Sequence, residues 1–166
     1  MSASRLVTRP LRRAWPLLAA LLWAAAVTAD APKQVIGAVE TIRVEPSGIE
    51  LRARVDTGAQ TTSIHAEDIE IDGDGDARGK PIRFRVVNRL GQSAWVETHV
   101  AREITVRTSE GSERRYAVPL TLSWRQDSKP VLVTLNDRAQ MRYRLLLGRN
   151  WLRGDYIVDV EINDED

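Results

Sequence analysis

One short segment has the residue types and the setting that acid–base chemistry requires. Asp56-Thr57-Gly58-Ala59 directly follows Leu51–Val55, where apolar and charged residues alternate as they do in a half-buried strand. Such a strand delivers the Asp56 carboxylate to a tight loop, and a glycine there lets the backbone approach it closely. We predict Asp56 as the catalytic residue, supported by the loop residues Thr57, Gly58 and Ala59. The alternative is an ordinary strand-end turn.

Other common catalytic and metal-binding chemistries lack the residues they need. The chain has no cysteine, which excludes disulfides, thiolate catalysis and cysteine-ligated zinc. His65 and His99 are the two histidines, whereas a structural zinc site takes four close ligands. There is no His-Glu-x-x-His and no Gly-x-x-x-x-Gly-Lys-Ser/Thr phosphate loop. We therefore predict no metal site, no cofactor and no ATP binding.

The N-terminal segment has the three parts of a secretory signal peptide. Four arginines and no acid precede the apolar run Ala14–Val27, and Val27-Thr28-Ala29 offers small residues for cleavage. We predict residues 1–29 as a signal peptide and 30–166 as one domain with its core at about 35–162, in the periplasm or secreted. The apolar run is shorter than the roughly 20 residues of a bilayer-spanning helix, so an uncleaved membrane anchor is the secondary alternative.

Charge argues against a nucleic-acid partner. The full chain has 24 basic and 23 acidic residues, and removal of the four N-terminal arginines leaves 20 against 23. Nucleic-acid-binding domains concentrate positive charge on one face. The predicted mature domain is instead mildly acidic with mixed signs.

Period-two patterning dominates the rest of the chain. Short alternating runs are separated by turn-forming residues at intervals typical of all-β barrels and sandwiches. The segment Gly148–Leu152 is the place where one short helix can begin. We predict an all-β fold with a single short helix near the C-terminus.

Two segments resemble the retropepsin-like aspartic peptidases. Asp56–Ala59 matches their active-site signature, and Leu145–Leu152 (LLLGRNWL) resembles the apolar-apolar-Gly-Arg-Asn segment that opens their C-terminal helix. The glycine of the second segment comes 92 positions after Asp56 (148 minus 56), in the family's order. The resemblance implies that Leu147, Gly148 and Arg149 pack beside the active-site loop.

A wider resemblance covers most of the chain after residue 36. It is to a bacterial family historically named as ATP-dependent zinc proteases and now described as retropepsin-like. The segments that carry it are Gly37–Glu40, Arg52–Ala66, Thr108–Arg115, Thr134–Met141 and Leu145–Leu152. The resemblance implies a closed acid-protease barrel. One departure concerns Gln60, which stands where retroviral enzymes commonly have an acid that pairs with the arginine, so Arg149 must find another partner. We expect Gln60 to contact substrate.

Peptide hydrolysis by such a site needs two carboxylates that share a proton. The chain has a single Asp-Thr-Gly, so we expect a homodimer that pairs Asp56 of each copy on a two-fold axis. Asp155 and Asp159 are the alternative partners within one chain.

An active-site lid that binds an extended peptide by strand addition is also expected. We place it in the hairpin Ile82–Val96, whose tip residues Leu90 and Gly91 would contact substrate. The rival is the hairpin tip Ser109–Ser112.

The function that these features predict is a secreted aspartic endopeptidase, a hydrolase acting on a peptide or protein substrate. The alternative is a non-catalytic module on the same fold that binds a peptide or a partner protein.

Overall fold

Strands, most of them paired antiparallel, make up most of the described part of the chain, as the period-two patterning predicts. The computed structural model describes residues 32–73, 75–108 and 111–162. Its elements follow one another along the chain as β1 (Gln34–Ile36), β2 (Val39–Glu45), β3 (Ile49–Val55), β4 (Thr62–Ile71), β5 (Pro81–Val87), β6 (Ser93–His99), β7 (Arg102–Thr108), β8 (Gly111–Trp124), β9 (Asp127–Asn136), β10 (Leu145–Leu147), α1 (Arg149–Leu152) and β11 (Tyr156–Val158). The prediction of an all-β fold with one short C-terminal helix is confirmed for these residues.

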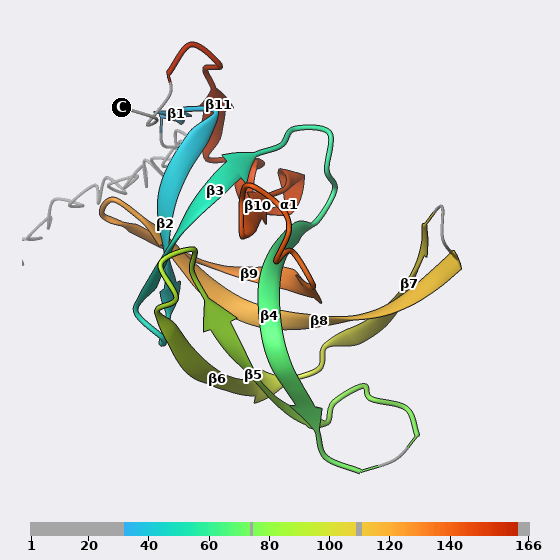
Figure 1. The fold of residues 1–166 in the computed structure, drawn as a ribbon. Coiled ribbons are helices and arrows are strands. Elements are labelled where there is room, and N and C mark those ends of the chain that lie inside the picture. The colour runs from blue at the N-terminus through green and yellow to red at the C-terminus, as the bar shows by residue number, and fades with distance from the viewer. Residues whose placement is uncertain (1–31, 74, 109–110, 163–166) are drawn as a thin grey trace, which may run out of the picture. The chain divides into compact units, whose positions relative to one another are not determined.

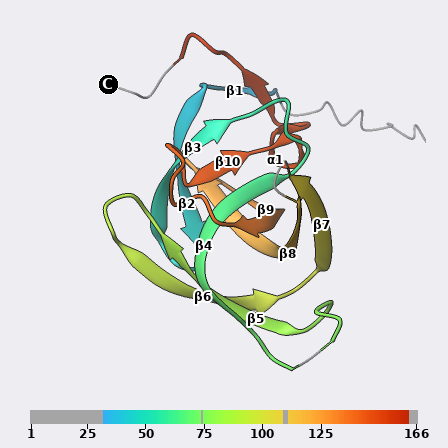
Figure 2. The same cartoon turned by 45° about the vertical axis from the view of Figure 1, so that its right-hand side comes forward.

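The central feature of the topology is the short strand β10. It pairs in parallel with β3 and antiparallel with β4, so it joins the two strands that flank the Asp56 loop. The remaining pairings follow the order β3-β2-β8-β9-β4-β5-β6, and β1 pairs separately with β11. The ribbon views show β10 between β3 and β4, with α1 beside it (Figures 1 and 2).

Alternation decides which side chains enter the core. On β3, Leu51, Ala53 and Val55 are buried while the arginines between them are exposed. The register places Leu145 opposite Ala53 and Leu147 opposite Val55, and both leucines are fully buried. Burial of a leucine side chain contributes about 1.5–3 kcal/mol, so this triple-leucine strand anchors the Asp56 loop to the core.

Strand β4 extends well beyond the apolar residues at its start. The sequence is mostly polar from Glu67 onwards, but the strand runs on to Ile71. Its polar half pairs with β5, and the register shifts between Glu67 and Glu70. Cross-strand ion pairs accompany this pairing, because Arg83 contacts Glu70 at 2.6 Å and Arg85 contacts Glu67 at 3.1 Å.

Strands β7 and β8 form a second long hairpin. Within the described residues β7 pairs with β8, from Arg102 opposite Ala117 to Thr108 opposite Gly111. Figure 1 shows the two strands projecting together away from the other strands, and the turned view keeps β7 alongside β8 (Figure 2). Residues 109–110 at the tip lie outside the described residues.

The C-terminal segment is fixed by an aromatic cluster. The ring of Tyr156 stacks on Trp151 at 4.5 Å and meets Trp124 edge-on at 5.5 Å. Both tryptophans are buried, so the end of α1 and the start of β11 are tied to the turn between β8 and β9.

The predicted signal peptide falls on residues that the structure does not describe. The periplasmic or secreted location therefore stays a prediction. No helix in the described ranges is long and apolar enough to cross a bilayer.

The aromatic cluster predicts a pH effect on stability. Burial, followed by the negative charges of Asp127 and Asp155, raises the pKa of Tyr156 from 10.0 to about 12. Tyr156 ionises at lower pH in the unfolded chain than in the folded one. Its contribution to the free energy of unfolding should therefore be complete below about pH 10 and be lost as pH rises towards about 12. Tyr156→Phe should reduce this alkaline slope, measured by denaturant titration at each pH. Tyr116→Phe, outside the cluster, is the matched control, and an equal change from both variants would contradict the assignment.

Candidate functional site around Asp56

The Asp56 carboxylate is held by the backbone of its own loop. Its Oδ1 accepts hydrogen bonds from the N–H groups of Gly58, at 2.9 Å, and Ala59, at 3.1 Å. The backbone N–H of Asp56 donates to the carbonyl of Leu147 at 3.0 Å. Oδ2 has no hydrogen-bond partner in the described part of the chain, and Asp56 is half-buried. One carboxylate oxygen therefore orients the side chain and the other is available to a ligand.

Arg149 holds the outer side of the same loop. Its Nη1 donates to the carbonyl oxygens of Thr57, at 2.9 Å, and Gly58, at 2.7 Å. The backbone N–H of Arg149 donates to the carbonyl of Ala59 at 2.9 Å, and that of Asn150 donates to Gln60 at 3.2 Å. Gln60 stands where retroviral enzymes commonly have an acid that pairs with the arginine. In this chain Arg149 pairs with carbonyl groups of the loop instead.

Gly148 allows the start of α1 to approach the loop that follows Asp56 closely. A Cβ atom at this position would lie 2.6 Å from the carbonyl carbon of Thr61 and 2.9 Å from the backbone nitrogen of Thr62. Larger residues would push the start of α1 away from the loop. The glycine is therefore required by packing rather than by an unusual backbone angle.

Asn150 joins the loop to two strands through one side chain. Its Oδ1 accepts from both the backbone N–H and the hydroxyl of Thr62, each at 2.8 Å, and its Nδ2 donates to the Leu132 carbonyl at 2.7 Å. The hydroxyl oxygen of Thr62 in turn accepts from the N–H of Gly148 at 3.1 Å. Sequence reasoning assigned no role to Thr62 or Asn150, although the second belongs to the Gly-Arg-Asn segment.

Arg138 interacts electrostatically with Asp56 and with a second arginine, Arg115. Arg138, between β9 and β10, is only 9% exposed, and its Nε donates to the carbonyl of Tyr143 at 3.0 Å. Burial lowers the pKa of Arg138, the cation of Arg115 lowers it further, and the Asp56 carboxylate acts in the opposite direction. Arg115 on β8 is itself paired with Glu113 at 2.7 Å. Neither arginine carries a local sequence signal that marks it as a site residue.

The structure brings together most of the predicted site residues. Thr57, Gly58 and Gln60 are exposed at the loop surface, while Leu147 and Gly148 lie buried beneath it. Ala59 is half-buried and, like the others, belongs to the loop that Arg149 contacts. The catalytic and substrate-binding roles assigned to these residues stay predictions.

Leu90 and Gly91 lie at the tip of the hairpin that β5 and β6 form. Leu90 is 85% exposed, and the neighbouring Asn88 donates from Nδ2 to the carbonyl of Glu50 at 3.4 Å. Glu50 lies near the start of β3, and Arg89 donates to the carbonyls of Met141 and Arg142 before β10. The tip of the hairpin is therefore held against these two segments, and its role as a lid over the Asp56 loop stays a prediction. The rival hairpin of β7 and β8 carries Arg115, the residue whose charge acts on Arg138.

The two other acids considered as partners within the chain are engaged at the C-terminal segment. Asp155 forms an ion pair with Lys129, and the Oδ1 of Asp159 accepts from the N–H of Glu161 at 3.0 Å. No hydrogen bond in the described residues joins either of them to Asp56.

His65 and His99 are not brought together as metal ligands. His65 is 1% exposed, with its Nε2 at 2.9 Å from Oε1 of Glu67 and its Nδ1 accepting from the N–H of Arg138. This pattern places the ring proton on Nε2 when His65 is neutral. Within the described ranges no group of three or more His, Cys, Asp or Glu is arranged to hold a metal ion.

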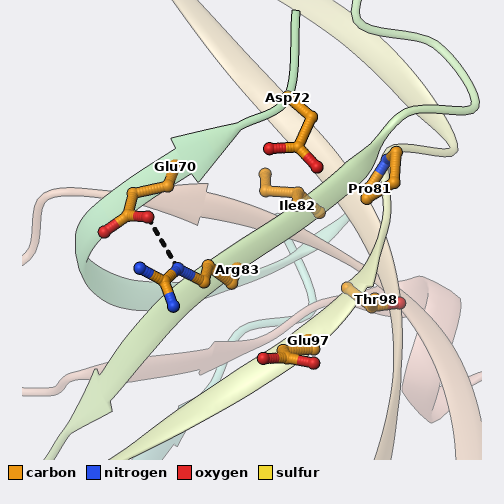
Figure 3. A pocket seen from close by; sticks show the side chains of 7 residues that line it. All are labelled: Glu70, Asp72, Pro81, Ile82, Arg83, Glu97 and Thr98. Atoms are coloured by element: carbon orange, nitrogen blue, oxygen red, sulfur yellow. Dashed lines mark hydrogen bonds and ion pairs between the residues drawn. The ribbon is translucent and has the colours of Figure 1, made fainter.

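A separate pocket of about 440 Å³ lies between the far end of β4 and the adjoining ends of β5 and β6. Figure 3 shows Glu70, Asp72 and Glu97 around it, with Arg83 turned towards Glu70. It contains none of the predicted site residues. The Asp56 loop precedes β4, so this pocket is not part of the candidate site.

The fold and the Asp56 loop define a retropepsin-type domain. The family described as "RimB-like: Retropepsin-like aspartic endopeptidase RimB" matches residues 35–164, and the chain belongs to that family. The predicted family resemblance is confirmed. A solved structure of a Legionella pneumophila protein of unknown function is similar with a TM-score of 0.65 and 25% identity, over 77% of this chain and 94% of that one.

Curated relatives are named for a different activity. A probable alpha-L-glutamate ligase of Parasynechococcus marenigrum is 34% identical over 134 residues, and one of Desulfotalea psychrophila is 31% identical over 138. Each alignment covers 78% of this chain but 28% and 29% of the respective ligase. The chain thus spans less than a third of the relatives' length.

These names correct the predicted function. The prediction of a secreted aspartic endopeptidase, with its assignment to the hydrolases, is wrong by this comparison, because the relatives are named as ligases. The error arose because the Asp-Thr-Gly and Gly-Arg-Asn segments specify how the loop is built. They do not specify the reaction in which the domain takes part.

The loop geometry predicts a specific loss of stability. Asn150→Ala should lower the free energy of unfolding by about 1–3 kcal/mol, because it leaves polar groups of Thr62 and Leu132 without partners. Chemical denaturation measures the effect. Gln126→Ala, at an exposed turn position, is the control and should change stability little. Equal stability of the two variants would show that Asn150 does not hold the site together.

Proposed function

We propose that this chain is a binding domain of an α-L-glutamate ligase system, and that it holds a glutamate-bearing chain at the Asp56 loop. The relatives that contain this domain are named as alpha-L-glutamate ligases, and most of their length lies outside the matched segment. The ligation chemistry is assigned to that other part, because this chain has no phosphate-binding loop. The domain's role is to present the chain that such a ligase extends.

One observation carries this proposal. Asp56 presents a carboxylate oxygen without an internal partner on a loop whose other polar groups are fixed by Arg149 and Asn150. A chain of glutamates is extended by repulsion between its own charges, so its backbone N–H groups face outwards. The Oδ2 of Asp56 can accept a hydrogen bond from one of them, and the exposed loop surface leaves room for the rest.

The same proposal includes a closed barrel as the scaffold. Because β10 pairs with both β3 and β4, the pairings β10-β3-β2-β8-β9-β4 return to their starting strand. A closed sheet has no free edge in this region. That closure would hold the loops at both ends of β3 and β4 in fixed relation to each other.

A second copy of the chain is the partner we propose. Val35 on β1 and Ile157 on β11 are register partners, and both are exposed at 46% and 55%. Val160 and Ile162 nearby are also exposed. Adjacent apolar side chains of this size favour a protein contact, and a homodimer through this surface would bring two Asp56 loops into one assembly.

Substitution of the central carboxylate tests the proposed binding. Asp56→Asn keeps the shape but replaces the free acceptor oxygen, so a blocked tetraglutamate peptide should bind about tenfold more weakly, the usual scale for one charge-assisted hydrogen bond. Isothermal titration calorimetry with the full chain gives the dissociation constants.

Asp72→Asn is the matched control because it removes an equal charge at a site remote from the loop. It should leave the affinity within about twofold. Wild-type chain that binds no glutamate peptide, or binding that Asp56→Asn does not weaken, would contradict the proposed function.

The dimer is tested by a charge placed on its proposed surface. Ile157→Glu should shift the sedimentation coefficient to that of a monomer at concentrations where the wild type is dimeric, because it buries a charge against apolar side chains. Leu90→Glu alters an exposed leucine elsewhere and should change nothing. A wild-type chain that sediments as a monomer both with and without peptide would contradict the proposed homodimer.

A further inference from the structure

We propose that Arg138 and Arg144 form a subsite that binds a side-chain carboxylate of the ligand next to Asp56. The inference rests on the proposed function and names the residues that would give the site its preference for glutamate over a neutral residue. Both arginines belong to the segment between β9 and β10.

Arg138 is a buried cation whose guanidinium is incompletely used. Its backbone N–H donates to Nδ1 of His65 at 2.9 Å and its Nε to the carbonyl of Tyr143, which fixes the residue at both ends. Its two terminal nitrogens have no hydrogen-bond partner among the described residues. A guanidinium fixed through Nε and free at its terminal nitrogens has the planar pair of donors that a carboxylate binds.

Arg144 also has guanidinium nitrogens without hydrogen-bond partners, and two of them are buried. Its Nε and Nη1 are buried with no hydrogen-bond partner, and its side chain is 17% exposed. The acid that lies near it is Glu67, whose Oε1 is 3.9 Å from Nη1, too far for a hydrogen bond. Glu67 is already engaged by His65 and Arg85. Buried unpaired donors cost free energy and require an explanation, and a bound anion supplies one.

The two arginines share one set of contacts. The N–H of His65 donates to the carbonyl of Arg144 at 2.7 Å, and the ring of His65 accepts from the backbone of Arg138. Tyr143, whose carbonyl accepts from Arg138, directly precedes Arg144. Both backbones therefore contact the same buried histidine, which places the two arginines in one part of the fold.

The charge balance favours an acidic group at this place. Arg115 is close enough for its charge to lower the pKa of Arg138, and its own partner is Glu113. The Asp56 carboxylate acts on the pKa of Arg138 in the opposite direction. A carboxylate on the ligand would relieve the repulsion between the cations, and Asp56 would remain free to accept a backbone hydrogen bond.

The hairpin of β5 and β6 supports this subsite from outside. The Nη1 of Arg89 donates to the carbonyls of Met141 and Arg142 at 3.1 and 3.2 Å. The hairpin tip thus holds the segment that carries both arginines. This contact gives the Leu90–Gly91 tip a structural place that does not require it to cover Asp56.

Discrimination between acidic and neutral ligands is the measurement that tests the subsite. Acetylated, amidated tetraglutamate and tetraglutamine differ only in side-chain charge, so the ratio of their affinities reports carboxylate recognition. The full chain should prefer tetraglutamate by more than tenfold in calorimetric titration. Arg138→Gln and Arg144→Gln should each reduce that ratio by about tenfold, and Arg138→Lys should retain more of it than Arg138→Gln.

Arg125→Gln is the matched control, since Arg125 is an exposed arginine over the ring of Trp124. It should keep the wild-type ratio. A merely structural role for Arg138 would weaken both peptides equally and leave the ratio unchanged, which would overturn the inference. Circular dichroism checks folding, and Arg144→Gln and Arg138→Lys decide the matter if Arg138→Gln does not fold.

The test separates the two proposals. Wild-type binding of tetraglutamate with an unchanged ratio in Arg138→Gln and Arg144→Gln would overturn the subsite and leave the proposed function standing. Failure of the wild type to bind tetraglutamate at all would overturn the proposed function, and the subsite with it.

Discussion

The hydrogen bonds from the Arg149–Asn150 segment to the Asp56 loop are the interactions on which the rest of the site depends. The six residues between β3 and β4 (56–61) are exposed or half-buried, so burial does little to hold them in place, and their carbonyl groups need partners. Arg149 satisfies two of those carbonyls with one guanidinium nitrogen, and the backbone of α1 satisfies two more. The cost is a very close approach, which Gly148 alone makes possible.

That arrangement gives a rigid carboxylate on an accessible surface, with buried positive charge nearby. Such a combination suits recognition of an extended chain that carries both backbone N–H groups and acidic side chains. The family description names an endopeptidase and the curated relatives are named as ligases, and both contain this domain. In the function proposed above, the domain holds the glutamate chain and another part of the ligase system performs the ligation.

The sequence predicted the parts of the site that are local or that repeat a known segment. Leu51–Val55 and the Asp56 loop were found from alternation and a tight turn, and the partnership with Gly148–Arg149 came from family resemblance across 92 positions (148 minus 56). Alternation also predicted the hairpin of β5 and β6. It could not say over which end of β3 that hairpin lies, because Asn88 and Arg89 set its position through long-range contacts.

The residues that sequence reasoning missed share one property. Thr62 and Asn150 contact each other, and the backbones of Arg138 and Arg144 both contact His65, far away in the chain. Their neighbours in sequence give no sign of these contacts. The polar half of β4 shows too little apolar alternation to mark it as a strand, and ion pairs with β5 accompany its pairing instead. Pairings of this kind are decided by the fold, so they become visible only in three dimensions.

The most direct measurement of the central claim is the map of backbone amide shifts when isotope-labelled chain is titrated with tetraglutamate. The account predicts that perturbed amides gather on residues 56–60 and on 138–144, the two segments that supply the fixed carboxylate and the buried arginines. Perturbations confined to the pocket between β4, β5 and β6, or none at saturating peptide, would contradict it.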